Sequence, residues 1–257
     1  MSKVLIIGGG HAGANTAYAL RKDGFDGEIT IISDESYLPY HRPPLSKDFL
    51  KHKITSEKLS FKSSDFYEEQ NISINLNTRI NAIDLELNHA KAKDKLFDFD
   101  YLVFSTGASP RLLLMENADA KNLFYLRQIT DVLSIQESIG SAKDIVLIGG
   151  GYIGLEVASA MIELGLSVTI LEAEERILQR VTSPEVSKFY NDFHCNKGVE
   201  IICNARISSL KAENKMINAV FLESGESIAA DIVLVGIGAI PNTQLADSIG
   251  LDCSNGI

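Results

Sequence analysis

The sequence lacks tryptophan and is poor in cysteine. Its 257 residues contain three cysteines, Cys195, Cys203 and Cys253, and no two of them form a C-x-x-C pair. No cysteine and histidine form a metal-ligand spacing either, so we expect no metal site. Buried or unreactive thiols are the favoured interpretation of all three.

Positive charge and long apolar runs are scarce as well. The chain has 24 Lys and Arg against 34 Asp and Glu, a net charge of −10, which argues against nucleic-acid binding. Its longest apolar run, residues 232 to 240, is far short of the ~20 residues that a membrane-spanning helix needs. Only four apolar residues follow Lys3 before the first glycines, so no targeting segment is expected. We expect a cytoplasmic protein without a membrane partner, and its oligomeric state stays open.

Two glycine-rich turns of one design are present, each between an apolar strand and a helix. The strand at residues 4–7 leads into Gly8-Gly9-Gly10-His11-Ala12-Gly13, and the strand at 145–148 leads into Gly149-Gly150-Gly151-Tyr152-Ile153-Gly154. Both fit G-x-G-x-x-G. The first glycine makes the turn, the second lets a pyrophosphate approach, and the third lets the helix pack on the strand. Backbone N–H groups at the helix start then face the phosphates, so two dinucleotide sites are predicted.

Acidic residues follow the next strand in both motifs. Asp34 and Glu35 come after residues 28–32, and Glu172 comes after residues 168–171. Such an acid accepts hydrogen bonds from ribose hydroxyls and repels the 2′-phosphate of NADP. Near Glu172 there are two more glutamates, and Arg176 is the only cation expected nearby. The second site is therefore expected to prefer NADH, although one glycine motif alone could be an ordinary turn of an α/β sheet.

Strands and helices alternate along the chain, which predicts an α/β fold with parallel sheets and two Rossmann-like dinucleotide-binding domains. Short β segments are expected between the motifs, at residues 72–100. Strands at 101–104 and 232–235 each precede a loop of small residues with a proline, at 105–111 and 236–242. We expect a first domain at 1–113, a second at 114–245, and the start of a return to the first domain at 246–257.

Four segments resemble the FAD-dependent, NADH-using reductases of ferredoxins and rubredoxins, within the pyridine nucleotide-disulfide oxidoreductase superfamily. They are Pro39-Tyr40-His41-Arg42-Pro43-Pro44-Leu45-Ser46-Lys47, Ser105-Thr106-Gly107-Ala108-Ser109-Pro110-Arg111, Gly149 to Glu156, and Gly236-Ile237-Gly238-Ala239-Ile240-Pro241-Asn242. The resemblance implies a glutathione-reductase-like fold in which the first glycine motif binds FAD and the second binds NADH. It also implies a later Gly-Asp flavin-binding segment and a C-terminal interface domain, and this sequence contains neither. We therefore expect the N-terminal two thirds of such a reductase, with weaker FAD binding.

The resemblance also implies the roles of single residues. Lys47 is expected beside flavin N5, paired with Glu156, and these two are the catalytic candidates. Periodicity alone instead predicts Glu156 on a solvated stripe with Ser159 and Glu163, opposite an apolar face. The remaining cofactor-binding candidates are Arg42, Pro43, Thr106, Gly107, Arg111, Arg127, Tyr152, Ile153, Gly236, Ile237 and Gly238, together with the glycine turns and their acids. For Arg127 a surface salt bridge is the alternative.

The histidines are expected to do little. His11 stands at a variable position of the first turn, which supplies backbone rather than side chain, and His89 and His194 are expected at the surface. The segment from His41 to Lys62 carries six cationic residues against Asp48 and Glu57, a local net charge of +4. This segment is predicted to be either a solvated surface or a docking site for an acidic ferredoxin.

Two functions remain open. The chain is expected to transfer hydride from NADH to FAD and then electrons to a ferredoxin or rubredoxin. No cysteine lies in residues 36–41, so the single-cysteine peroxide and CoA-disulfide chemistry of related enzymes is not expected. The alternative is a truncated nucleotide-binding remnant, or a binding protein similar to apoptosis-inducing factor, with little turnover.

Overall fold

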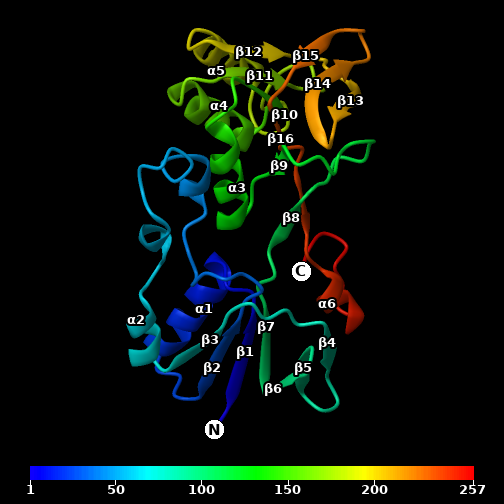
Figure 1. Cartoon of the computed structure of the whole chain (residues 1–257). Helices are drawn as coiled ribbons and strands as arrows, with labels where there is room; N and C mark the ends of the chain where they lie inside the picture. Colours follow the sequence, from blue (N-terminus) through cyan, green and yellow to red (C-terminus); the bar gives the residue numbers. More distant parts are fainter. The chain divides into compact units, whose positions relative to one another are not determined.

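The chain forms two compact units, shown in a computed structural model that describes residues 1–257 (Figure 1). The first unit comprises Met1–His41, Glu57–Ser109 and Ile240–Ile257, and the second comprises Arg42–Ser56 and Pro110–Ala239. The expected domain limits at residues 113 and 245 stay predictions. Residues 42–56 belong to the second unit, in keeping with the Lys47–Glu156 pair that the resemblance implied.

A four-stranded parallel sheet forms the centre of the first unit. Its order is β3-β2-β1-β7, with β1 at Lys3–Ile7, β2 at Glu28–Ile32, β3 at Ile72–Asn75 and β7 at Tyr101–Phe104. Residues 4–7 of β1 are all buried, because parallel strands are covered on both faces. The strands predicted from the apolar runs are therefore confirmed.

Different elements cover the two faces of this first sheet. On one face, Ala17 of α1 (His11–Lys22) packs with Ile6 and Ile31. The other face packs against Ala90 and Phe99. Ala90 belongs to a three-stranded antiparallel sheet of β4 (Ala82–Asp84), β5 (His89–Ala92) and β6 (Lys95–Asp98), and Phe99 follows β6 directly. The short helices of the unit are η2 (Ser56–Leu59), α2 (Ser64–Glu69) and α6 (Gln244–Ser248).

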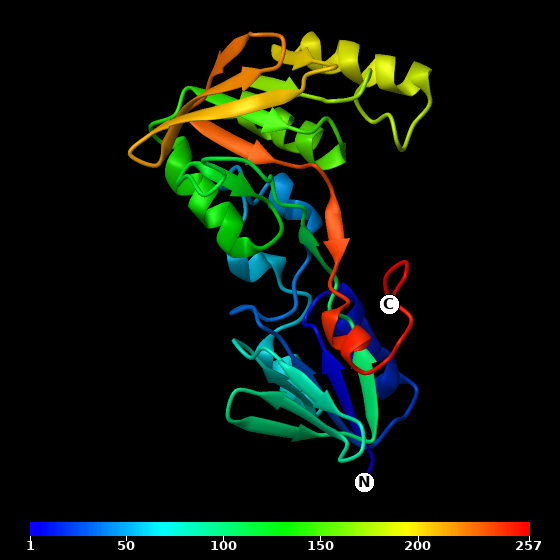
Figure 2. The ribbon, with the colours of Figure 1, turned by 90° about the vertical axis from the view of Figure 1, so that its right-hand side faces the viewer.

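The second unit repeats this design around a five-stranded parallel sheet. Its order is β12-β11-β10-β16-β9, with β9 at Leu123–Tyr125, β10 at Asp144–Ile148, β11 at Ser167–Leu171, β12 at Val199–Ile202 and β16 at Ile232–Val235. Helix α4 (Tyr152–Glu163) packs on β10 and β11. The opposite face is covered by β13 (Ile207–Glu213), β14 (Met216–Leu222) and β15 (Ser227–Ala229), as Figure 2 shows. The other helices are η1 (Pro43–Ser46), α3 (Ile129–Ile139) and α5 (Pro184–Cys195).

The register places both glycine turns at the same point of their sheets. Ile7, the last residue of β1, pairs with Ile32 and Phe104, and Ile148, the last residue of β10, pairs with Leu171 and Val235. Each turn therefore starts at the carboxyl end of a central strand, where open α/β sheets bind ligands. Two further short strands, β8 (Ala108–Pro110) and β17 (Ala239–Pro241), pair with each other.

The structure corrects two expectations about burial. The helical periodicity puts Ile153 on the apolar face of α4 with Val157 and Ala160, but Ile153 is 45% exposed, whereas Val157 and Ala160 are buried together with Leu155, Ala158 and Met161. His194, expected at the surface, is buried at the end of α5. No helix is long and apolar enough to cross a membrane.

Candidate dinucleotide sites

The first glycine of each motif makes a turn that no other residue fits. Gly8 and Gly149 have φ angles of +116° and +111°, a region that L side chains rarely adopt. A Cβ atom on Gly8 would lie 2.1 Å from the carbonyl oxygen of Ser105, and one on Gly149 would lie 2.5 Å from that of Gly236. Each turn thus passes directly against the residue that follows the neighbouring strand.

The third glycine of each motif lets the helix approach the turn. A Cβ on Gly13 would lie 2.1 Å from the oxygen of Gly8, and a Cβ on Gly154 would lie 2.2 Å from the oxygen of Gly149. Both distances are far inside van der Waals contact. The close packing of helix on turn, predicted from the spacing, is present in both units.

The middle glycine of the second motif faces open space. No atom lies within 4 Å of a Cβ built on Gly151, although Cβ atoms on its neighbours in the motif would clash. Gly151 and Gly10 are the N-caps of α4 and α1, and neither helix start has a side-chain cap or an acidic residue in its first turn. The first-turn N–H groups, including that of Ala12, therefore suit an anionic ligand, and the geometry fits a pyrophosphate.

Glu172 lies beside the second turn as expected. Its Oε2 accepts a hydrogen bond of 2.8 Å from the Gly150 amide, and its Oε1 accepts one of 3.0 Å from the Glu174 amide. These two bonds hold the carboxylate at the end of β11.

The cation expected beside this site is Arg176, but its guanidinium donates to Thr182, Ser187 and Gln179. Arg180 instead approaches Glu174, with 3.8 Å between NH2 and Oε1. Arg176 is therefore bound within the loop after β11, which folds back on itself, and a second arginine lies beside Glu174.

The first unit has a serine where the second has Glu172. Ser33 follows β2 directly and is buried, and a Cβ on Gly9 would lie 2.8 Å from its side chain. Asp34, one residue later, is exposed and lies 3.6 Å from Arg79. The Glu35 carboxylate accepts a hydrogen bond from the phenol of Tyr40. Sequence reasoning missed Ser33, because only the register shows which residue is equivalent to Glu172. It also gave no role to Tyr40, whose bond to Glu35 appears only in the structure.

The two similar loops, 105–111 and 236–242, lie against each other. The Thr106 hydroxyl donates to the Asn242 carbonyl oxygen at 2.6 Å, and the Asn242 side chain donates to the Thr106 carbonyl oxygen at 2.9 Å. The Asn242 amide donates to Gly107, and the Arg111 amide donates to Gly238, each at 2.9 Å. Asn242 is thus a central residue of this loop pair.

Lys47 and Glu156, the two catalytic candidates, form an ion pair in the second unit. Lys47 Nζ lies 2.7 Å from Glu156 Oε2, and the Ser46 hydroxyl donates to the same oxygen. Lys47 Nζ also donates to the Pro43 carbonyl oxygen at 3.2 Å. Helix η1 begins at two prolines, which fix the backbone that presents both cationic and hydroxyl groups. Periodicity alone is therefore wrong about Glu156, whose carboxylate is paired rather than fully solvated.

Arg42 and Arg127 also come together. The Arg42 guanidinium donates to the Arg127 carbonyl oxygen at 2.7 Å, and the Asp131 carboxylate accepts from the Arg127 amide at 2.8 Å. The Arg42 contact connects the segment before η1 to the start of α3.

Three further candidates lie near the second turn. At the first turn of α4, the side chains of Tyr152 and Ile153 are exposed, while Ile237 packs against the core of the unit.

The lysines after η1 are paired with α4. Lys51 and Lys53 lie 2.9 Å and 3.1 Å from Glu163 Oε2, and Lys51 also lies 3.6 Å from Asp48. The Lys51 hydrogen bond is the main reason why the pKa of Glu163 is lowered. The net charge of residues 41–62 is +4, but Glu156 and Glu163 of α4 pair with its lysines and offset part of this charge.

The ring of His11 packs against two other rings, those of Phe61 and His41. Its centroid lies 4.6 Å from that of Phe61 and 5.8 Å from that of His41, both in edge-on contacts. All three cysteines have free thiols. Burial raises the pKa of the Cys203 thiol, and the charge of nearby Glu172 raises it further, so this thiol is not activated.

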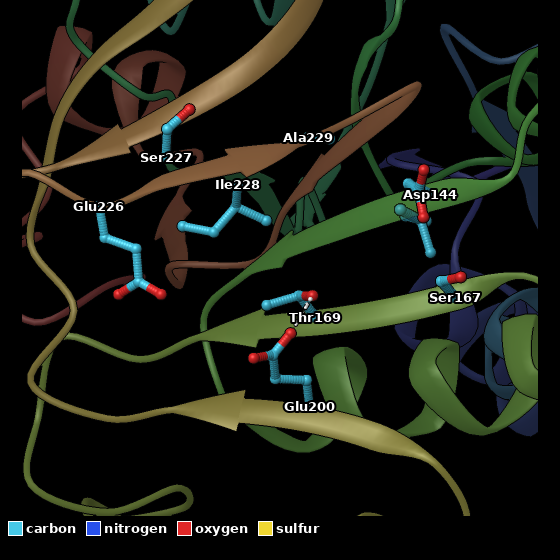
Figure 3. A pocket seen from close by; sticks show the side chains of 9 residues that line it. Asp144, Ser167, Thr169, Glu200, Glu226, Ser227, Ile228 and Ala229 are labelled. Carbon is cyan, nitrogen blue, oxygen red and sulfur yellow. Dashed lines mark hydrogen bonds between the residues drawn. The ribbon is translucent and has the colours of Figure 1, made fainter.

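A shallow hollow of about 320 Å³ lies elsewhere in the second unit (Figure 3). Asp144 and Ser167, the first residues of β10 and β11, are part of its lining, with Thr169 and Glu200. The hollow is thus at the amino end of these strands. The glycine turn is at their carboxyl end, so the hollow is separate from the predicted coenzyme site.

Comparison with known proteins agrees with this geometry. Residues 2–257 match the family model described as pyridine nucleotide-disulphide oxidoreductase. Rubredoxin-NAD(+) reductase of Pseudomonas putida is 40% identical over 99% of this chain, and putidaredoxin reductase of the same organism is 38% identical over 99%. In a crystal structure of the covalent putidaredoxin reductase–putidaredoxin complex, a chain with 38% identity matches all of this chain with a TM-score of 0.96.

The chain spans 66% of the rubredoxin reductase and 62% of the putidaredoxin reductase, and 63% of the matched chain in that complex. The fold is accordingly α/β with two Rossmann-like dinucleotide-binding units of the kind found in these oxidoreductases. The chain belongs to the pyridine nucleotide-disulphide oxidoreductase family.

Proposed function

We propose that this chain is the FAD- and NADH-binding part of a reductase that transfers electrons from NADH through FAD to a ferredoxin or rubredoxin. The carrying observation is that both units place an uncapped helix start and a glycine turn at the carboxyl end of a central parallel strand. The names of the relatives, which are reductases of rubredoxin and putidaredoxin, support the choice of acceptor.

In this proposal the first unit binds FAD and the second binds NADH. Bound FAD would accept a hydride from NADH and release single electrons to an iron–sulfur partner. The turn at Gly8 and Gly13 and the N–H groups of α1 bind one pyrophosphate, and those around Gly151 and Gly154 bind the other.

Glu172 supports the choice of NADH. Its carboxylate is held at the end of β11 by the Gly150 and Glu174 amides, in position to accept from ribose hydroxyls and to repel a 2′-phosphate. Tyr152 and Ile153, which are exposed at the start of α4, would contact the coenzyme in this proposal. In this proposal the ion pair of Lys47 and Glu156 would supply one cation and one anion beside the reacting rings.

An anaerobic titration tests the proposal. The purified chain, reconstituted with FAD, should show a flavin absorbance band that bleaches when NADH is added, with NADPH much less effective. NADH oxidation should then support reduction of an acidic ferredoxin or a rubredoxin. A colourless protein that binds nucleotides without bleaching would refute the proposal and favour the binding-protein alternative.

We also propose a cytoplasmic location, where NADH is available to such a reductase. Cell fractionation tests this location.

A further inference from the structure

We propose that Ser46 is the positioning residue for the Glu156 carboxylate, holding it in one orientation for hydride transfer. This inference rests on the proposed function, in which Glu156 lies beside the coenzymes. The resemblance implied no role for Ser46, whose contact with Glu156 joins residues 110 positions apart.

The hydroxyl of Ser46 has one good acceptor. Its side chain belongs to a residue only 4% exposed, and its Oγ donates to Glu156 Oε2. The other acceptor within reach, the Pro43 carbonyl oxygen, lies at 3.4 Å, beyond the usual range for an O–H donor. The single hydroxyl proton is therefore committed to the carboxylate.

Lys47 cannot fix this orientation by itself. Its side chain is 46% exposed, and an exposed lysine on a flexible stem forms weak, mobile ion pairs. Ser46 differs, because it has one rotatable side-chain bond, is buried, and ends a short helix that starts at two prolines. A charge-assisted hydrogen bond from such a residue is short and directional.

Both groups bind the same oxygen of Glu156. Ser46 and Lys47 contact Oε2, and no other protein group is hydrogen bonded to this carboxylate. Oε1 therefore stays available as an acceptor, in an orientation that Ser46 determines. Without the hydroxyl, the carboxylate follows the movement of Lys47, and fewer molecules hold the reactive geometry at any moment.

A double-mutant cycle tests the inference on the whole FAD-loaded chain. The variants are Ser46→Ala, Glu156→Ala and the double variant, with Ser159→Ala on the exposed side of α4 as the matched control. We expect Ser46→Ala to slow flavin reduction at saturating NADH about 10-fold, as loss of a hydrogen bond to a charged group does. The dissociation constant for NADH should change less than about twofold, and Ser46→Thr should recover most of the rate.

The cycle decides whether Ser46 acts through Glu156. In the Glu156→Ala background, Ser46→Ala should change the rate less than about twofold. An equal loss of rate in both backgrounds, or a loss confined to NADH affinity, would overturn the inference.

The same cycle in urea unfolding needs no flavin chemistry. There the effects of Ser46→Ala and Glu156→Ala should be non-additive, and strict additivity would also overturn the inference. If the unmodified chain is not reduced by NADH at all, the proposed function fails and this second cycle still judges the Ser46–Glu156 contact.

Discussion

Replacing each of two glycines, Gly151 and Gly154, by alanine should affect different properties of the second unit. Gly154→Ala places a methyl group 2.2 Å from the oxygen of Gly149, about 1 Å closer than carbon and oxygen normally approach. Gly151→Ala places a methyl group in open space, with no atom within 4 Å. The first substitution should therefore damage the fold, and the second should damage coenzyme binding.

The magnitudes follow from the geometry. Alanine in a helix gains about 1 kcal/mol over glycine, but overpacking against a backbone oxygen costs up to about 3 kcal/mol. The second unit should thus lose about 2 kcal/mol in Gly154→Ala, which lowers its urea midpoint by about 1 M for an m-value near 2 kcal/mol/M. In Gly151→Ala the loss of a glycine N-cap should cost no more than about 1 kcal/mol.

The binding effects run the other way. In Gly151→Ala the methyl group occupies the approach of the pyrophosphate, and loss of hydrogen bonds to a charged group should weaken NADH binding at least about 10-fold. Urea unfolding followed by circular dichroism and NADH fluorescence titration measure both quantities. Unchanged NADH affinity in Gly151→Ala, or an unchanged midpoint in Gly154→Ala, would refute this account of the motif.

Three further predictions concern charge. Glu172→Arg should shift the preference from NADH toward NADPH, because it removes the ribose acceptor and the repulsion of the 2′-phosphate; a coenzyme ratio that does not change contradicts the assignment. Lys51→Glu/Lys53→Glu should slow ferricyanide reduction as much as ferredoxin reduction, because it sets like charges against Glu163 and loosens residues 42–56; selective loss with ferredoxin would instead support a docking site. Acid should destabilise the second unit through buried His194, because burial lowers its pKa below the ordinary 6.5.

The sign of the His194 effect follows from linkage. Below pH 6.5 the imidazole of His194 is protonated in the unfolded chain but stays neutral in the folded one. The free energy of unfolding is therefore highest above this pH and falls as the pH drops toward the lowered pKa of the folded state. His194→Gln should make the urea midpoint depend less on pH between pH 7 and 5. An equally steep dependence in this variant would argue against the role of His194.

For the Lys51→Glu/Lys53→Glu variant, Lys58→Glu is the matched control, because Lys58 is exposed and forms no ion pair with Glu163.

Local patterns were enough to predict much of the fold. Apolar runs such as residues 4–7 and 232–235 predict buried parallel strands, because a strand covered on both faces needs no polar alternation. The glycine spacing predicts part of the turn as well, since a side chain on Gly13 would clash with the carbonyl oxygen of Gly8, only five residues earlier. A resemblance in sequence motifs then indicated which coenzyme each turn binds.

Long-range packing decided what these local patterns could not. Periodicity left Glu156 on a solvated stripe. The resemblance implied its pair with Lys47, but only the folded chain shows its contact with Ser46. The charge count of residues 41–62 was misleading for the same reason, since Glu163 is distant in sequence. The equivalence of Ser33 and Glu172 likewise depends on strand register. The sequence therefore determines the features that depend on nearby residues, such as the apolar strands and the glycine turns. The partner of a charged side chain depends instead on which elements the tertiary structure brings together.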